Sequence, residues 1–430
     1  MEVRIEKLVY GGDGLAHHDG QTVFVPLVLP GELVNIEFAT RKKKFVRGRL
    51  ERVVEASPER IAAPCPYFGR CGGCQYQHIS YHAQLRYKAD ILRETLSRIG
   101  HVRWDGPVGT HASPPFGYRN RAQWKIRAVN GGAAGAPGIG YFEAGSTRLC
   151  AVDECAILSP RLAETFAKLR SLVASNKSFS AIDEIEAFCD GADEKLLLNL
   201  SAERLTESSE AIATALREAM PGAESILVQD RHADKFELFG PGYLSYAAGG
   251  FEYRVGHLSF FQVNRFLIDG LIEAVISDSR GRLALDLFAG VGLFTVPLAK
   301  RFDRVIGVES NLAAARDLES NLQSSGGASL AHRHMTAEAF LSHWHENPDL
   351  VILDPPRAGV EPETLTHLKK LAPRRINYVS CDPATLARDL AALVGAPEKP
   401  GPYDIRDIYV FDIFPQTYHM EALVQLTRRI

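Results

Sequence analysis

A cysteine at a predicted strand-to-helix junction is the residue of this sequence best placed for covalent chemistry. In "NYVSCDPATLARDL" (377–390), Cys381 follows an apolar run that ends at Val379. Asp382 and Pro383 suit the N-cap and the first position of a helix that begins there. Free cysteine most often packs as a small hydrophobic side chain, whereas the dipole of a helix N-terminus favours the thiolate. Two interpretations of Cys381 follow, a packing residue or a nucleophile.

Acidic residues recur at the ends of the apolar segments that surround this cysteine. From about residue 257, apolar strands alternate with helix-length segments, which predicts a parallel, doubly wound sheet built on "RLALDLF", "DRVIGVE", "DLVILDPP" and "RINYVSCDP". Such sheets bind ligands at the carboxyl ends of their strands. We therefore expect the strand ends to converge, which favours the functional interpretation of the cysteine over packing; these residues are Asp286, Glu309, Asp354 and Cys381.

The first two of these strand ends carry a nucleotide-binding pattern. In "LDLFAGVGLF" (285–294), Asp286 ends a strand, and Gly290 and Gly292 let a ligand approach the backbone. Glu309, at the end of the second strand, can accept hydrogen bonds from a ribose. A dinucleotide is the alternative ligand, but Thr295 replaces the third glycine of G-x-G-x-x-G. The pattern therefore favours S-adenosylmethionine.

The third strand end, "LDPPRAG" (353–359), argues against two simpler methylation schemes. Methyltransferases that act on amino groups use an aromatic residue after (Asn/Asp)-Pro-Pro, and Arg357 occupies that place. Enzymes that methylate carbon 5 of cytosine in RNA often have cysteine after the proline pair, and this is absent too. A nucleophile must come from another element, and Cys381 ends the next strand of the same sheet.

Methylation of carbon 5 of uracil requires both a thiolate and a base. Thiolate addition to carbon 6 makes carbon 5 nucleophilic, and a base must later remove the carbon 5 proton so that the thiolate leaves. A cysteine with an ordinary pKa of about 8.5 is only a few per cent ionised at neutral pH. The helix after Cys381, and Arg388 if it folds back, are the candidates for lowering that pKa. Glu421 in "QTYHMEALV" is the candidate base, although an isolated carboxylate there would more often lie at the surface.

A second group of cysteines has the spacing of a metal site. Seven cysteines are present, and three crowd into "CPYFGRCGGC" as Cys65, Cys71 and Cys74. In a reducing cytosol this pattern indicates metal ligation rather than disulfides. With a fourth thiolate, either a tetrahedral zinc ion or a 4Fe-4S cluster is compatible with the spacing. Cys150 and Cys155 are the two candidates for the fourth ligand.

Composition and texture divide the chain into three parts. The 430 residues, 46% of them hydrophobic, suffice for several cores, and the net charge of −3 excludes a generally basic nucleic-acid-binding protein. Residues 1–56 predict a small β-barrel, 57–255 a central α+β domain with the cysteine group, and 256–430 the doubly wound domain with an antiparallel edge. The helical pattern at 81–100 is expected to pack on the last of these. We expect a cytoplasmic protein, because no membrane span or signal peptide is evident. We also expect a monomer.

Two basic stretches are candidates for contact with RNA. The first lies on a predicted hairpin of the barrel and comprises Arg41, Lys42, Lys43, Lys44, Arg47 and Arg49. The second, "GYRNRAQWKIR" (117–127), interleaves basic residues with Tyr118 and Trp124, as single-stranded RNA recognition requires. A half-buried strand with a charged face is the equally weighted alternative for 117–127.

Together, "SCDPATLARD", "DPPRAG", "LDLFAGVG", "FFQVN" and "HMEAL" resemble the uracil-5 RNA methyltransferase family, which makes 5-methyluridine in tRNA and 23S rRNA. The resemblance spans nearly the whole chain and implies that Cys381 is the nucleophile and Glu421 the proton acceptor. It also implies S-adenosylmethionine contacts at Gln262, Phe288, Glu309 and Asp354, beside the pattern residues Asp286, Gly290 and Gly292.

The same resemblance extends to the other two parts of the chain. It implies an OB-like TRAM barrel that binds RNA, and a 4Fe-4S cluster held by Cys65, Cys71, Cys74 and Cys155. The expected substrate is 23S rRNA, with tRNA as the alternative. Departures from the family pattern are Ala289, Leu293 and Asp382. The competing class is a non-catalytic iron–sulfur RNA-binding or assembly factor, against which the presence of both Cys381 and Glu421 argues.

Overall fold

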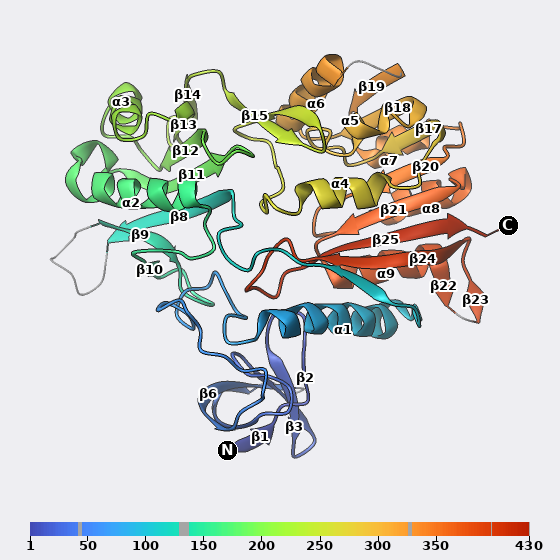
Figure 1. Cartoon of the computed structure of the whole chain (residues 1–430), viewed down its shortest axis with the longest axis horizontal. Helices are drawn as coiled ribbons and strands as arrows, with labels where there is room; N and C mark the ends of the chain where they lie inside the picture. The colour runs from blue at the N-terminus through green and yellow to red at the C-terminus, as the bar shows by residue number, and fades with distance from the viewer. Residues whose placement is uncertain (42–44, 129–136, 326–328, 397, 430) are drawn as a thin grey trace.

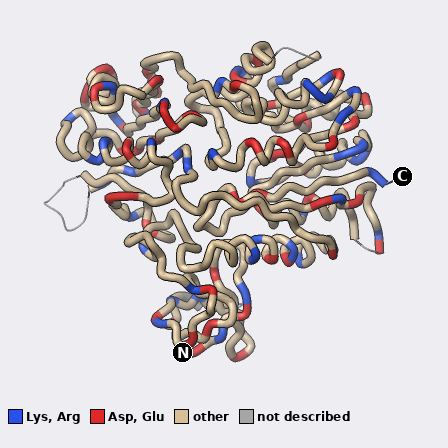
Figure 2. The backbone as a smooth tube through the Cα atoms, viewed as in Figure 1, with Lys and Arg blue, Asp and Glu red and all other residues tan. Residues whose placement is uncertain are grey.

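The structure, a computed structural model, describes residues 1–41, 45–128, 137–325, 329–396 and 398–429 (Figure 1). Three sheets organise it. In Figure 1 the N-terminal sheet lies below the long helix α1, the central sheet lies at the left, and the C-terminal sheet lies at the right. Lys and Arg residues are interspersed with Asp and Glu residues in all three parts (Figure 2), in keeping with the small net charge. Among the described residues, none of the helices is both long enough and apolar enough to cross a membrane.

The N-terminal sheet has six strands in the order β1-β5-β6-β4-β3-β2. Its outermost strands, β1 and β2, are separated by only two residues of chain, so the sheet curls back on itself as the predicted barrel would. Alternating apolar residues such as Val3, Ile36 and Val46 fill its core. The strands are β1 (Glu2–Arg4), β2 (Lys7–Leu8), β3 (Gly14–His18), β4 (Gln21–Val25), β5 (Leu33–Arg41) and β6 (Phe45–Glu55).

The basic hairpin of this sheet is only partly described. Lys42, Lys43 and Lys44 lie outside the described residues. Arg47 forms an ion pair with Asp13 at 3.1 Å, and Arg49 pairs with Glu37. These two arginines are exposed and have acidic partners within the barrel.

The central sheet has seven strands in the order β10-β9-β8-β11-β12-β13-β14. Only β12 and β13 pair in parallel; the other neighbours are antiparallel. The strands are β8 (Arg121–Ala128), β9 (Pro137–Phe142), β10 (Leu149–Ala151), β11 (Ile182–Cys189), β12 (Leu196–Ala202), β13 (Ala223–Asp230) and β14 (Lys235–Phe239), and the helices are α2 (Pro160–Ser175), η1 (Lys177–Phe179) and α3 (Ser209–Ala219).

The stretch 117–127 forms part of this sheet and matches the half-buried alternative. Tyr118 and Trp124 are fully buried, and the Trp124 ring stacks on Phe166 with the centroids 5.1 Å apart. Arg121 and Lys125 pair with glutamates of the neighbouring strand β11. The two aromatic rings therefore serve the core. Arg121 and Lys125 have acidic partners, whereas Arg119 and Arg127 donate to backbone carbonyls.

The C-terminal sheet has eight strands in the order β19-β18-β17-β20-β21-β25-β24-β7. Strands β19, β18, β17, β20 and β21 pair in parallel, and β17, β18, β20 and β21 are the predicted apolar segments; β25 is antiparallel to both of its neighbours. The strands are β17 (Gly281–Asp286), β18 (Phe302–Glu309), β19 (Ser329–His334), β20 (Leu350–Leu353), β21 (Arg375–Ser380), β24 (Tyr403–Phe411) and β25 (Glu421–Arg428).

Helices lie on both faces of this sheet (Figure 1). They are α4 (Ile268–Ile276), α5 (Thr295–Leu298), α6 (Leu312–Ser325), α7 (Ala337–Ser342), α8 (Pro362–Leu371) and α9 (Pro383–Val394). Two small hairpins complete this part, β15 (Tyr243–Ala248) with β16 (Phe251–Gly256), and β22 (Gly395–Ala396) with β23 (Lys399–Pro400).

Two elements from the middle of the chain join the C-terminal sheet. Helix α1 (Tyr81–Gly100) buries Ile91, Leu92 and Leu96 in the core that also contains Leu386 and Leu390 of α9. Strand β7 (Val108–His111) pairs in parallel with β24 and forms the outer edge of the sheet. The packing of the 81–100 helix on the C-terminal part was predicted, whereas β7 was not.

Candidate active site

Cys381 lies at the junction that the sequence predicted. It follows β21 directly, and α9 begins two residues later at Pro383. The side chain of Asp382 caps this helix, because its Oδ1 accepts hydrogen bonds from the N–H groups of Ala384 and Thr385, both at 2.9 Å. The negative charge of Asp382 is therefore directed at the helix N-terminus.

Glu421 begins β25, the strand beside β21. The two strands are antiparallel and pair Ala422 with Ser380, so Glu421 lies opposite Cys381 one step beyond the last pair. The Glu421 side chain is buried, with 4% of the residue exposed. The surface alternative considered for an isolated Glu421 is therefore wrong. A base and a thiol stand at the same edge of the sheet.

The environment of Cys381 does not by itself favour the thiolate. Burial raises the pKa of the Cys381 thiol to about 11, and the charge of Glu421 acts in the same direction. Arg357 opposes both, through its charge and through a hydrogen bond to the thiol. The expected helper, Arg388, instead pairs with Asp389 and donates to Ala358 O at 2.9 Å. Arg357 is the cation of this site.

Three acidic side chains gather at this edge of the sheet: Asp286 and Glu421 are buried and Asp354 is half-buried, and the charges of Glu421 and Asp354 act on the thiol. Burial raises the pKa values of Asp286 and Asp354 to about 7, and the charge of Asp286 adds to the shift of Asp354. Burial, and then the charge of Asp354, raise the pKa of Glu421 well above its usual range. Thr295 donates to one oxygen of Asp286 at 2.6 Å, and the other oxygen is buried without a hydrogen-bond partner among the described residues. Grouped acids of this kind ionise most readily when a cationic ligand lies beside them.

The glycine-rich turn after β17 has the backbone that the pattern predicted. Gly290 has φ +54° and Gly292 has φ +96°, and a Cβ on Gly292 would lie 2.8 Å from Leu318 Cδ1. The N–H of Gly290 donates to Glu309 at 2.8 Å, which joins this turn to the end of β18. The turn thus brings Glu309 and the glycines together at the carboxyl edge of the sheet.

The remaining predicted cofactor contacts, Phe288 and Gln262, come from two different segments. Phe288 is half-buried in the same turn and packs against the core of the C-terminal part. Gln262 is buried in the loop between β16 and α4, where its carbonyl accepts a hydrogen bond from Asn120 at 3.3 Å. Gln262 is the one predicted contact that comes from outside the strand ends.

Four of the cysteines line a single cavity of about 360 Å³: Cys65, Cys71, Cys74 and Cys155. Burial raises the pKa of Cys71 to about 11 and that of Cys74 to about 12, and the charges of the other cysteines of the cavity act in the same direction. Cys150 is buried in β10 and does not line the cavity. Within the described part of the chain, no three His, Cys, Asp or Glu side chains are grouped closely enough to hold a metal ion.

The cysteine cavity borders the carboxyl edge of the C-terminal sheet. Its lining also includes Arg357, Thr417 and His419, and the charge of Arg357 lowers the pKa of the Cys381 thiol. No role for Arg357 was predicted from the sequence, although its place directly after the proline pair that follows β20 puts it beside β21. This position in the sequence is the signal from which a role for Arg357 beside the thiol could have been predicted.

A residue of the N-terminal part of the chain also contacts Cys381. Tyr10 donates a hydrogen bond to the backbone oxygen of Cys381 at 3.1 Å. Its ring meets the Tyr418 ring edge-on, with the centroids 5.5 Å apart. Nothing in the sequence around Tyr10 indicated this contact, because it joins residues 371 positions apart.

Comparisons with known proteins agree with this geometry. The family model described as tRNA (uracil-5-)-methyltransferase matches residues 80–429, and the TRAM domain model matches residues 1–50. An RNA methyltransferase of Aquifex aeolicus is 32% identical over 99% of this chain and 98% of its own. The 23S rRNA (uracil(1939)-C(5))-methyltransferase RlmD of Alkalilimnicola ehrlichii is 32% identical over 100% of this chain and 96% of its own.

A solved structure matches along the whole length as well. The tRNA (uracil-54, C5)-methyltransferase of Pyrococcus abyssi, in complex with S-adenosyl-L-homocysteine, superposes with a TM-score of 0.76 at 25% identity. The match covers 99% of this chain and 100% of that chain. The resemblance found in the sequence motifs is thereby confirmed, and the chain belongs to the tRNA (uracil-5-)-methyltransferase family, with a TRAM domain at its N-terminus.

Proposed function

We propose that this protein transfers a methyl group from S-adenosylmethionine to carbon 5 of a uridine in 23S rRNA. The observation that carries the proposal is the placement of Cys381 and Glu421 opposite one another at the carboxyl edge of the C-terminal sheet. The choice of 23S rRNA rests on full-length relatives named for that substrate, and tRNA is the alternative because the matching solved structure is a tRNA enzyme.

The reaction divides into three steps that these residues can perform. The Cys381 thiolate bonds to carbon 6 of the uracil, and the electron pair of the ring double bond moves into an enolate. Carbon 5 then takes the methyl group, and S-adenosylhomocysteine leaves. Glu421 accepts the proton from carbon 5, the double bond re-forms, and the carbon–sulfur bond breaks to release the thiolate.

Charge at the site supports this sequence of steps. Arg357 is the cation beside the thiol, so it stabilises the thiolate that attacks the ring. The sulfonium of S-adenosylmethionine would add a second positive charge near Asp286 and Asp354, whose pKa values burial raises to about 7. That charge favours the ionised form of these two carboxylates. Arg357 acts on the base as well, because its charge lowers the pKa of Glu421 against the effect of burial.

We assign the methyl donor to the carboxyl edge of the C-terminal sheet. The glycine-rich turn offers backbone for close approach, and the remaining carboxylate oxygen of Asp286 is buried and free of partners among the described residues. The residues proposed to hold S-adenosylmethionine are Gln262, Asp286, Phe288, Gly290, Gly292, Glu309 and Asp354.

We propose further that the cysteine cavity holds a 4Fe-4S cluster. Its four cysteines match the four-thiolate ligand set of such a cluster, and the resemblance to the family favours the cluster over a zinc ion. Among the two candidates for the fourth ligand, the lining of the cavity favours Cys155 over Cys150. A bound cluster would join the 65–74 segment to the start of α2, and the proposed reaction needs no electron transfer from it.

The three-part division of the chain also remains a proposal. The sheets support a TRAM unit at 1–56, a central unit within 57–255 and a methyltransferase unit at 256–430. Because α1 and β7 pack on the C-terminal sheet, we assign residues 81–111 to the methyltransferase unit.

A trapping experiment tests the proposed function. The purified protein is incubated with S-adenosylmethionine and a 23S rRNA transcript that contains 5-fluorouridine. Because fluorine cannot leave as a proton, the methylated adduct should persist and appear as a slowly migrating band in denaturing electrophoresis. Cys381→Ala should form no adduct and lose activity on the order of 10⁴-fold or more, while its affinity for S-adenosylmethionine stays within about twofold of the wild-type value.

The matched control is Cys189→Ala, which removes a thiol buried in the central sheet and should trap normally. The absence of a trapped species in the wild-type protein, with S-adenosylmethionine bound, would favour the non-catalytic RNA-binding factor. Mass spectrometric mapping of 5-methyluridine in ribosomal and transfer RNA from cells lacking the protein then identifies the substrate.

A further inference from the structure

The loop between β24 and β25 is held by hydrogen bonds that its own backbone carbonyls accept. Residues 412–416 present five successive carbonyl oxygens, and each accepts a hydrogen bond from a donor outside the loop. The donors are Asn264 Nδ2 to Asp412 O (3.3 Å) and Ile413 O (3.2 Å), Lys88 Nζ to Phe414 O (3.1 Å), Tyr118 Oη to Pro415 O (3.0 Å), and the N–H groups of Gln75 and Tyr76 to Gln416 O (3.0 and 2.9 Å). We call this arrangement the carbonyl clamp.

The last residue of the clamp is held in an unfavourable backbone conformation. Gln416 has φ +69°, which L-residues other than glycine rarely adopt. Its N–H donates to Gln84 Oε1 and its Oε1 accepts from Gln84 Nε2, both at 3.0 Å. Gln84 is fully buried on α1 and also donates to Tyr76 O and Ile79 O. Strained residues persist where their surroundings determine the conformation, and they gather at functional sites.

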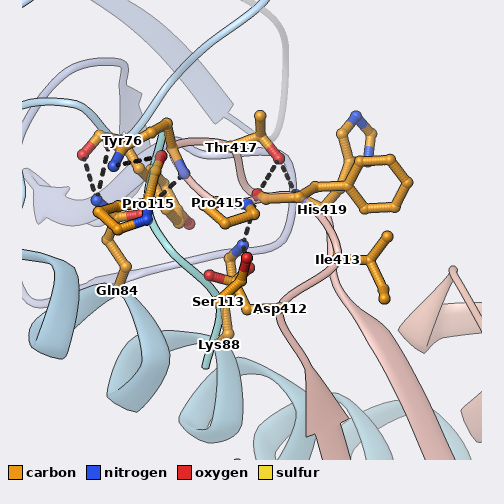
Figure 3. A network of polar contacts seen from close by, with 12 residues as sticks. Tyr76, Gln84, Lys88, Ser113, Pro115, Asp412, Ile413, Pro415, Thr417 and His419 are labelled. Carbon is orange, nitrogen blue, oxygen red and sulfur yellow. Dashed lines mark hydrogen bonds and ion pairs between the residues drawn. The ribbon is translucent and has the colours of Figure 1, made fainter. Parts of the chain in front are cut away.

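The first residue of the clamp is fixed by a buried ion pair. Lys88 on α1 lies 2.5 Å from Asp412, and both side chains are fully buried (Figure 3). A buried pair gains little net stability over apolar residues, because the desolvation cost offsets the attraction. It does define one position for the loop, because Lys88 bonds both the side chain of Asp412 and the carbonyl of Phe414.

We propose that the carbonyl clamp positions Glu421 for proton removal, and that Tyr118, Gln84 and Lys88 are positioning residues for this step. The inference rests on the proposed function. The clamp ends five residues before Glu421, and the intervening chain carries Thr417 and His419 on the wall of the cysteine cavity. Figure 3 shows Gln84 and Lys88 extending from α1 toward this loop. Every donor to the carbonyls of the clamp belongs to a segment other than the parallel strands of the C-terminal sheet, at whose edge Cys381 lies.

The clamp should therefore act on one chemical step and leave another unchanged. Cys381 is fixed by its own strand and by the capped helix that follows, neither of which uses the clamp. A loosened loop leaves adduct formation intact and slows removal of the carbon 5 proton. The adduct then accumulates on ordinary RNA, as it would when Glu421 itself is lost.

Two tyrosines of the chain allow a matched test. Tyr118 and Tyr403 are both fully buried, and each donates to a proline carbonyl at 3.0 Å, Tyr118 to Pro415 in the clamp and Tyr403 to Pro373 away from it. In single-turnover reactions with the full-length protein, 23S rRNA transcript and S-adenosylmethionine, Tyr118→Phe should slow adduct resolution about three- to tenfold. Adduct formation should stay within about twofold of wild type. Tyr403→Phe should change neither rate.

A second readout separates positioning from general loss of stability. With RNA deuterated at carbon 5 of uridine, Tyr118→Phe should show a larger isotope effect than wild type, because proton removal becomes more rate-limiting. Gln84→Met, which removes the amide contacts at similar volume, should show the same signature. The proposed role of the clamp would be overturned if Tyr118→Phe and Tyr403→Phe resolved the adduct at equal rates. It would also be overturned if Tyr118→Phe slowed adduct formation and adduct resolution to the same extent. Failure of wild type to trap on 5-fluorouridine RNA would instead overturn the proposed function.

Discussion

Cys381 and Glu421 begin at neighbouring strand ends, but the chain positions them by different means. We propose Cys381 as the nucleophile, and its backbone is fixed by the end of β21, by Asp382 as the helix cap and by Pro383 at the first turn. We propose Glu421 as the base; it pairs with Phe411 of β24 and follows a loop whose carbonyls are held by donors from α1, the segment before β8 and the cysteine-bearing segment. The proposed nucleophile therefore depends mainly on neighbours in the chain, whereas the proposed base also depends on donors from distant segments.

Replacing Glu421 should produce the largest difference between the rate of adduct formation and the rate of adduct resolution. Glu421→Gln keeps the shape of the side chain but removes its ability to accept a proton. We expect turnover to fall by about 10²- to 10⁴-fold, with adduct formation on ordinary RNA nearly unchanged. Denaturing electrophoresis of the enzyme with 23S rRNA transcript should show the adduct without any fluorinated base.

The companion variant Cys381→Ala makes the contrast complete, because it should block the reaction before any adduct forms. If Glu421→Gln turned over at the wild-type rate, another group would have to remove the carbon 5 proton. The contrast between a locally fixed residue that attacks and a residue held by distant segments that removes the proton would then no longer hold.

Arg357 sharpens the comparison, because its charge acts on both Cys381 and Glu421. It lowers the pKa of Cys381 against the effect of burial, so Arg357→Met should raise that pKa further above about 11. Below the thiol pKa the reactive thiolate increases with pH, and each unit by which the pKa rises reduces the thiolate about tenfold. Adduct formation should therefore rise with pH in both proteins and be on the order of tenfold slower in the variant at every pH below that range.

The measurement is the single-turnover rate of adduct formation between pH 6 and 9. Arg357→Lys keeps the charge but not the planar group, and should recover part of the rate. Identical pH profiles for wild type and Arg357→Met would mean that the guanidinium does not assist the thiol. A variant of Arg388, which pairs with Asp389 instead, should follow the wild-type profile.

The features that could be predicted from the sequence are those that depend on neighbours in the chain, and the features that could not be predicted depend on distant segments. Strand ends, the Asp382 cap and the glycine turn depend on neighbours in the chain, and their patterns placed Cys381, Asp354 and Gly290 at one edge. The roles of Arg357 and Tyr10 depend on contacts between distant segments, and periodicity carries no trace of these. The stretch 117–127 shows the opposite problem, a local pattern that fits two different structures. Interleaved basic and aromatic residues suit RNA binding, but they also describe a strand that buries Trp124 and pairs cations with glutamates of the next strand.

The smallest expected effect concerns the one contact from the TRAM domain to the locally fixed residue. Tyr10 donates to the carbonyl of Cys381 at 3.1 Å, and Tyr10→Phe removes only that hydroxyl while the ring can still meet Tyr418. One hydrogen bond contributes about 1 kcal/mol, so adduct formation should slow by about two- to fivefold with unchanged affinity for RNA and for S-adenosylmethionine. Tyr403→Phe again serves as the control. A change in RNA affinity with no change in the rate of attack would show that Tyr10 serves RNA binding alone, and that the nucleophile needs no help from outside its own strand and helix.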